Sequence, residues 1–309
     1  PFLTQHPDID AVQIMLTDPS GVARGTNVRR QEPEALFTGG RNVAGSILGL
    51  DVTGADVEAT GLVWESGDAD KLCRPVPGTL QPTPWLPRTG QVMLSMYELD
   101  GSPAAADPRH CLARAEQRLQ QLGYSAVFAC EVEFYLLQAL PDGSHVPAGS
   151  DAPRAGQGER IEAYSLARLD NLAPLFRDVL DAADAQGLPA GTVMSEYAPG
   201  QFEITLEHRA DAQRAVDEAV LFKRAVRGVA ARHGCIACFM AKPFGNRDGN
   251  GYHTHVSLLD RDGRNVFDDG TDKGSATPRH AIAGLAEVMA DSMLLLAPHR
   301  NSYRRLQRG

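Results

Sequence analysis

The sequence of 309 residues lacks several features that mark special classes of protein. It has no run of about 18 apolar residues, so no membrane-spanning helix and no membrane partner are expected. Its first residues, PFLTQHPDID, lack the basic and apolar regions of a signal peptide. Its five cysteines are an odd number without framework spacing, which favours free thiols and a reducing compartment. We therefore expect a cytoplasmic protein.

An excess of basic charge is also missing. The 30 basic and 39 acidic residues give a formal net charge of −9 and a pI near 5.5. A general binder of phosphate backbones needs a basic surface, so nucleic acid is not an expected partner. With 43% hydrophobic and 22% charged residues, the composition is that of a globular protein, which excludes wholesale disorder.

Classical nucleotide and zinc motifs are absent. The glycine-rich segment 244–251 (FGNRDGNG) matches neither GxGxxG nor the Walker lysine pattern, and a hairpin turn explains it equally well. Cys235 and Cys238 have the spacing of a redox or zinc motif, but they lie in an apolar strand without a second CxxC. Two small buried residues are the favoured interpretation of this pair.

Periodicity and turn signals predict an α+β fold with a β-rich first domain, residues 1–105, and a second domain, residues 106–309. The boundary precedes a helix for which Asp107 is the expected N-cap. A proline-rich connector is expected at 74–88. The predicted strands are 12–16, 22–28, 91–99, 125–137, a pair within 196–206, 235–242 and 252–259, and the later helices are 171–186, 211–233 and 277–296.

Three of these strands carry acidic or imidazole side chains on one face, because side chains two residues apart on a strand share a face. The opposite face of each strand is apolar and suits a core. The polar sets are Glu131 and Glu133, then Gln201, Glu203 and Thr205, then His253, His255 and Ser257.

Clustered carboxylates repel one another unless a cation compensates them. Several carboxylate oxygens and one imidazole suit Mg²⁺ or Mn²⁺, and the ligand set does not choose between the two. A solvated outer face would explain any single strand as well. Three such strands together favour a site for divalent cations.

At these residues the sequence resembles the glutamine synthetase family. The similar segments occur in the family's order and span about residues 107–306. They are 130–136 (CEVEFYL), 195–204 (SEYAPGQFEI), 239–244 (FMAKPF), 248–258 (DGNGYHTHVSL) and 301–306 (NSYRRL).

The resemblance implies an N-terminal β-grasp domain and a catalytic domain whose curved antiparallel sheet, flanked by helices, holds two or three divalent cations beside ATP. It also implies that a glutamate γ-carboxylate attacks the γ-phosphate of ATP and that an amine then displaces phosphate to leave an amide. By motif, the metal ligands are Glu131, Glu133, Glu196, Glu203 and His253; the nucleotide positions are His255 and Ser257; the glutamate positions are Asp248, Gly249 and Arg305, the last also the candidate catalytic residue.

Two departures from the family pattern concern the amine. The segment 48–54 (LGLDVTG) keeps Asp51 but lacks the serines of an Asp-Gly-Ser-Ser signature, and Asp248 stands where ammonia-using members have Asn. The form of segment 48–54 is similar to the γ-glutamylpolyamine (γ-glutamylputrescine) synthetase branch. The added negative charge of Asp248 changes the contact with the substrate amino group or favours a cationic amine, so a small organic amine is the expected substrate. The alternatives are a true glutamine synthetase that uses ammonia, a non-catalytic structural relative, and a guanidino kinase, which does not explain segment 301–306.

The resemblance also implies a homo-oligomer of stacked hexameric rings in which each active site is completed by a neighbouring subunit. Family members continue beyond the 301–306 motif through a segment that supplies a further metal-binding glutamate and nucleotide-contacting arginines. On that basis the C-terminal part of the catalytic domain is expected to be missing after Gly309, and residues 1–309 are expected to bind poorly and catalyse nothing.

Overall fold

The computed structural model describes residues 2–149 and 161–306, and the chain forms two compact units, Pro1–Arg118 and Leu119–Gly309. The helix α3 (Pro108–Gln121), which was expected to begin at residue 108, contains this division. Its N-terminus is capped as predicted, since Oδ1 of Asp107 accepts a hydrogen bond from the backbone N–H of Arg109 at 2.8 Å. Among the described helices, none is both long and apolar enough to cross a membrane.

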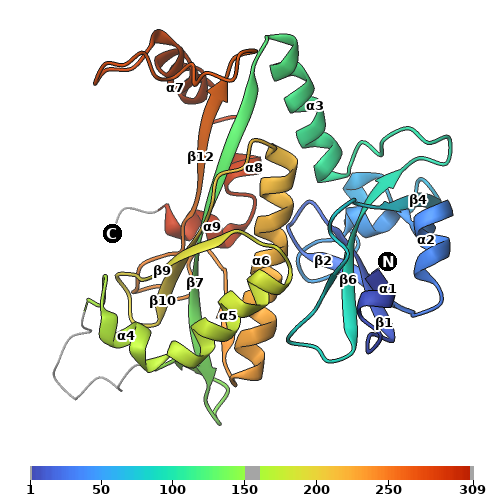
Figure 1. The fold of residues 1–309 in the computed structure, drawn as a ribbon, viewed down its shortest axis with the longest axis horizontal. Coiled ribbons are helices and arrows are strands. Elements are labelled where there is room, and N and C mark those ends of the chain that lie inside the picture. Colours follow the sequence, from blue (N-terminus) through green and yellow to red (C-terminus); the bar gives the residue numbers. More distant parts are fainter. Residues whose placement is uncertain (1, 150–160, 307–309) are drawn as a thin grey trace. The chain divides into compact units, whose positions relative to one another are not determined.

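The first unit is built on a mixed six-stranded sheet (Figure 1). The predicted strands 12–16 and 22–28 are present as β1 (Ala11–Thr17) and β2 (Ala23–Arg29), which form an antiparallel hairpin. Asp18 closes the turn by accepting 2.9 Å hydrogen bonds from the N–H groups of Ser20 and Val22. β1 runs parallel to β6 (Thr89–Tyr97), and β4 (Asp70–Pro75) runs antiparallel to β6. The strands, in sheet order, are β2 (Ala23–Arg29), β1 (Ala11–Thr17), β6 (Thr89–Tyr97), β4 (Asp70–Pro75) and β3 (Arg41–Ala44), with β5 (Gln81–Pro82) beside β6.

The second unit is organised by one long strand, β7 (Ser125–Ala139), which pairs antiparallel with four others. Glu131 lies opposite Thr205 on one edge and opposite His253 on the other, so the two partner strands flank β7. In Figure 1, β12 and β10 lie beside β7 accordingly. The other strands are β8 (His145–Pro147), β9 (Ala190–Ser195), β10 (Gln201–Leu206), β11 (Ile236–Cys238) and β12 (Tyr252–Leu259).

Two helices cover the apolar face of this sheet. They are α5 (Ala173–Ala185), which follows the short α4 (Leu166–Asn171), and α6 (Ala212–Arg232), and α6 packs against both α5 and β7. The ring of Phe176 on α5 lies 4.9 Å from that of Phe202 on β10, and Phe134 on β7 belongs to the same aromatic group. Because these side chains face the helices, the alternate residues of β7 and β10 face away from them. The acidic residues lie at those alternate positions.

Two local expectations were wrong. The strand expected at 235–242 ends at Cys238, because the side-chain amide of Asn250 donates to the carbonyls of Cys238 and Met240 at 3.1 and 2.8 Å, where a sheet partner would otherwise bind. The single helix expected at 277–296 is divided into α7 (Ala276–Val288) and α8 (Met293–Leu296). Residues 301–303 lie in the short helix α9 (Arg300–Arg305).

Candidate metal centre

The register of β7, β10 and β12 brings the predicted acidic residues together. Glu131 on β7 is paired with His253 on β12, and Glu133 is paired with Glu203 on β10. Directly paired residues on antiparallel strands have neighbouring side chains, and two like charges in such a pair are unfavourable. The pairing of Glu133 with Glu203 therefore calls for a compensating positive charge.

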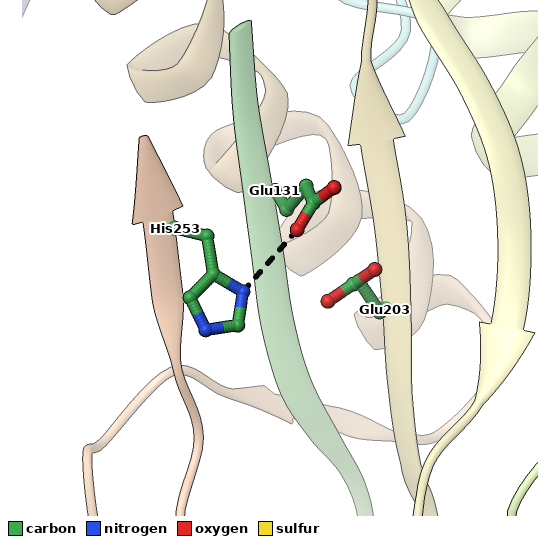
Figure 2. Close-up of side chains that lie close together, drawn as sticks. All are labelled: Glu131, Glu203 and His253. Carbon is green, nitrogen blue, oxygen red and sulfur yellow. Dashed lines mark hydrogen bonds and ion pairs between the residues drawn. The ribbon is translucent and has the colours of Figure 1, made fainter. Parts of the chain in front are cut away.

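Three of the expected ligands converge on one point. Ligand atoms of Glu131, Glu203 and His253 all lie within 4.8 Å of one another, and Figure 2 shows the three side chains directed toward one another from three strands. Nδ1 of His253 lies 3.2 Å from Oε2 of Glu131. Two carboxylates and an imidazole form a donor set that suits Mg²⁺ or Mn²⁺, so the residues fit the expected cation.

The charge state of the cluster supports the same interpretation. Glu203 is only 5% exposed, and burial, followed by the charges of Glu131, Glu196 and Glu133, raises its pKa from 4.5 to about 7. Burial and the charge of Glu133 also raise the pKa of Glu196, which follows β9. A divalent cation would stabilise the ionised form of both carboxylates.

The two residues expected at the nucleotide lie farther along β12. Nε2 of His255 is 2.9 Å from Oε1 of Glu131, so Glu131 lies between two histidines. Ser257 lies two residues on, on the same face, half-buried and paired with Val127. The ring of His208, which follows β10 and was not predicted as a site residue, lies 6.4 Å from the ring of His255.

The glycine-rich segment is a loop packed against the carboxylate cluster. A side chain at Gly249 would overlap the carbonyl oxygen of Ala241, and one at Gly251 would come within 2.6 Å of Oε1 of Glu133. Neither glycine has a positive φ, so both are required for close approach rather than for a turn. The backbone carbonyl of the preceding Asp248 accepts a 2.7 Å hydrogen bond from the hydroxyl of Tyr135, while its side chain is exposed.

The candidate catalytic residue Arg305 reaches this loop from α9. A side chain at Gly251 would lie 3.3 Å from Nη2 of Arg305, and one at Gly249 would lie 2.8 Å from its Cγ. Asn301 attaches the helix to the segment just before the loop, because its side-chain amide accepts from the backbone N–H of Lys242 at 2.8 Å and donates to the carbonyl of Lys242 at 2.9 Å. Nη2 of Arg305 and Oε1 of Glu133 both lie next to Gly251.

Two buried amides, Gln201 and Asn250, were not predicted from sequence as functional residues. Both are at most 5% exposed, and they are hydrogen-bonded to each other at 3.2 Å beneath the glycine loop. The alternation of β10, which places Gln201 on the same face as Glu203, was a signal for the first of them. No comparable pattern marks Asn250, which lies outside the strands.

A model of the glutamine synthetase catalytic domain matches residues 105–309, two thirds of the sequence. The chain belongs to the glutamine synthetase family. The matched range contains every predicted site residue, and the mixed N-terminal sheet and the antiparallel sheet with its helices confirm the predicted fold class. Divalent metals and ATP are the cofactor and co-substrate of this family.

Comparison with individual members of the glutamine synthetase family gives similar results over the whole chain. The chain is 37% identical over 310 aligned residues to γ-glutamylputrescine synthetase PuuA of Escherichia coli, covering all of this chain and 66% of that protein. It is 34% identical to glutamine synthetase of Thermus thermophilus, and the alignment covers 98% of this chain and 65% of that protein. The solved structure of a complex of GmaS with ADP superposes with a TM-score of 0.81 at 28% identity. The superposition covers 99% of this chain and 66% of that chain. The chain thus spans about two thirds of the length of these relatives.

Proposed function

We propose that the protein is an ATP-dependent ligase that joins glutamate to an amine. The γ-carboxylate of glutamate attacks the γ-phosphate of ATP, giving γ-glutamyl phosphate and ADP. The amine nitrogen then attacks the γ-carbonyl carbon, and phosphate leaves as the amide forms. The observation that carries this proposal is the convergence of Glu131, Glu203 and His253, within the range matched by the glutamine synthetase catalytic domain.

The proposed metal ligands are the four glutamates Glu131, Glu133, Glu196 and Glu203 together with His253. Phosphoryl transfer requires positioning and neutralisation of phosphate charge more than covalent help, and divalent cations supply both when they are bound. Strand pairing fixes the backbone positions of Glu131, Glu133 and Glu203 relative to one another before any ligand arrives. The site is thereby organised in advance for its cations.

The proposed nucleotide positions are His255 and Ser257, next to the cluster on β12. The proposed glutamate positions are Asp248, Gly249 and Arg305, where the loop and α9 meet. A guanidinium donates two parallel hydrogen bonds to a carboxylate or phosphoryl group, which suits Arg305 to the proposed catalytic role. The nearness of Arg305 to Gly251, which also borders Glu133, supports this role.

We infer that the amine is a small organic amine such as the polyamine putrescine. Asp248, with its exposed carboxylate, supports a cationic substrate, because a negative charge favours a protonated amine nearby. The name of the relative from E. coli, γ-glutamylputrescine synthetase, supports the same inference. Ammonia is the second candidate, supported by the identity to glutamine synthetase of T. thermophilus.

Trapping of the acyl phosphate tests the reaction class. Full-length protein with glutamate, ATP and Mg²⁺ is expected to convert hydroxylamine, a strong nucleophile for acyl phosphates, to γ-glutamyl hydroxamate. Formation of the hydroxamate should require ATP and stop when EDTA removes the cation. ATP hydrolysis without hydroxamate, or hydroxamate without ATP, would contradict the proposed ligase.

We also propose that the protein forms a homo-oligomer of stacked hexameric rings, as its family resemblance implies. Light scattering on the full-length protein measures the molar mass directly. A mass of twelve subunits supports two stacked rings, and a monomer would contradict this part of the proposal.

A further inference from the structure

Gln201 is a buried amide that joins the glycine loop to the carboxylate cluster. Its side chain is 2% exposed, and Nε2 lies 3.1 Å from Oε2 of Glu133, 3.1 Å from the carbonyl oxygen of Gly249 and 3.2 Å from Oδ1 of Asn250. The two hydrogens of an amide nitrogen are thus shared among one carboxylate and two groups of the loop. A single side chain connects the candidate cation site with the candidate glutamate site.

The backbone of Gln201 contacts Glu196, another proposed metal ligand. Its carbonyl accepts a 2.8 Å hydrogen bond from the N–H of Glu196, and its N–H donates to the carbonyl of Ala198 at 3.0 Å. Two residues farther along β10, Glu203 lies on the same face. Three of the proposed acidic ligands, Glu133, Glu196 and Glu203, are therefore adjacent to Gln201 through a hydrogen bond or through the strand.

The environment of position 201 favours an uncharged side chain that donates hydrogen bonds. Oε2 of Glu133 accepts from Nε2 of Gln201 and from the N–H of Gly251 at 2.8 Å, so two neutral donors fix the orientation of that carboxylate. Neutral donors satisfy the carboxylate without supplying the positive charge that a cation brings. Glu133 is half-buried, and a partly buried carboxylate that loses one such donor is freer to rotate and is less well satisfied.

We propose that Gln201 is a positioning residue, which orients Glu133 for a divalent cation and fixes the loop 249–251 against the cluster. This inference rests on the proposed function, because it takes Glu133 as a metal ligand. Removal of a hydrogen bond that orients a metal ligand typically lowers metal affinity 10-fold to 100-fold. Gln201→Met removes the donor while it keeps the length and approximate volume of the side chain, so about a 10-fold or greater rise in the Kd for Mn²⁺ is expected.

The experiment measures binding of Mn²⁺ alone by calorimetry, in full-length wild type, Gln201→Met and a matched control, Gln138→Met. Gln138 is exposed on the same strand as Glu133, outside the site. Hydrogen exchange of the amides of residues 249–251 is measured in the same three proteins. If Gln201→Met fails to fold by circular dichroism, Gln201→Asn replaces it, since asparagine keeps the amide but is one methylene too short to reach Glu133.

The proposal predicts weaker Mn²⁺ binding and faster exchange at 249–251 in Gln201→Met, with the control unchanged. Wild-type Mn²⁺ affinity in a folded Gln201→Met would overturn it. If wild type itself binds no Mn²⁺, the metal role in the proposed function fails, and hydrogen exchange then decides on Gln201. Faster hydrogen exchange at 249–251 in Gln201→Met would still support the contact between Gln201 and the loop. Unchanged exchange would overturn that part of the proposal as well.

Discussion

Two effects make ionisation of Glu203 unfavourable when no cation is bound. The side chain is buried, and its neighbours Glu131, Glu196 and Glu133 add negative charge around it. A pKa of about 7 means that folding favours the protonated carboxyl over a wide range of pH. A bound divalent cation reverses this preference, because it stabilises the carboxylate. Ionisation of Glu203 is therefore unfavourable without a cation and favourable when a divalent cation is bound.

This balance predicts a pH effect on stability. Because the folded-state pKa of Glu203 is raised from 4.5 to about 7, its contribution to the free energy of unfolding is fully present below about pH 4.5. The contribution is lost as pH rises through 7. In EDTA, Glu203→Gln is therefore expected to be more stable than wild type at pH 8, by up to about 3 kcal/mol, and nearly equal to it at pH 5.

Thermal unfolding in EDTA at pH 5 and pH 8 measures this difference. Glu207→Gln is the matched control, since Glu207 follows the same strand and is exposed. Addition of Mn²⁺ at pH 8 should raise the Tm of wild type more than that of Glu203→Gln. An equal pH dependence of Tm in wild type and Glu203→Gln would show that the pKa of Glu203 is not raised in this way.

A second prediction at this scale concerns thiols. Cys73 has no exposed surface, and burial together with the charge of Asp107 raises its pKa to about 12, while Cys111 is exposed. The reactive species is the thiolate, so a buried thiol with a high pKa reacts very slowly. Iodoacetamide at pH 8 should label Cys111 within minutes and Cys73 only in denaturant. Mass spectrometry of the labelled peptides tests this, and rapid native labelling of Cys73 would contradict its burial.

At the scale of elements, the strand β7 organises the second unit. Its residues also show which features of the site could be predicted from sequence. Strand alternation was enough to place Glu131 and Glu133 on one face, because that property is local. Which residue of β10 or β12 lies opposite each glutamate depends on register, which is set by contacts between distant segments. The convergence of Glu203 and His253 on Glu131 was therefore expected from the family resemblance and became visible only in the folded sheet.

The wrong helix prediction has a local cause. The apolar spacing that predicted one helix at 277–296 continues through Val288 and Leu294, so periodicity does not reveal a break. Asp291 and Ser292 lie in the turn between α7 and α8, and such side chains compete for backbone hydrogen bonds that a continuous helix needs. Periodicity reports which face is apolar, but it does not report where the helix ends.

The short helix α9 gives a prediction at this scale. A helix of six residues is not stable by itself, so its position depends on contacts such as the two hydrogen bonds between Asn301 and Lys242. Asn301→Ala removes both bonds and is expected to lower the free energy of unfolding by about 1–3 kcal/mol. It should also speed hydrogen exchange in α9 and raise the KM for glutamate, because Arg305 loses its fixed place.

Chemical denaturation, hydrogen exchange and steady-state kinetics measure these three effects. Asn301→Asp keeps the acceptor for the Lys242 N–H but loses the donor, so an intermediate effect is expected. Asn27→Ala, at an exposed asparagine of β2, serves as the control. Unchanged exchange in α9 of Asn301→Ala would show that other contacts hold the helix.

At the scale of the whole molecule, the family is established and the amine is a proposal. Members that differ in substrate share the catalytic domain, since 37% identity to γ-glutamylputrescine synthetase and 34% to glutamine synthetase extend over nearly the whole chain. The proposed role of Glu131, Glu203 and His253 concerns ATP and glutamate, which both candidate reactions use. The distinction between ammonia and an organic amine must lie in the residues that contact the amine, of which Asp51 and Asp248 are the candidates.

The last prediction separates these substrates. Full-length protein with glutamate, ATP and Mg²⁺ is expected to release phosphate faster with putrescine than with ammonium, with at least about a tenfold difference in kcat/KM, equivalent to about 1.4 kcal/mol. Asp248→Asn removes the charge proposed to favour a cationic amine, so it should lower kcat/KM for putrescine while the KM for ATP stays the same. Phosphate release and mass spectrometry of the amide product measure both quantities. Equal or greater turnover with ammonium in wild type would contradict the organic amine and leave glutamine synthetase as the activity.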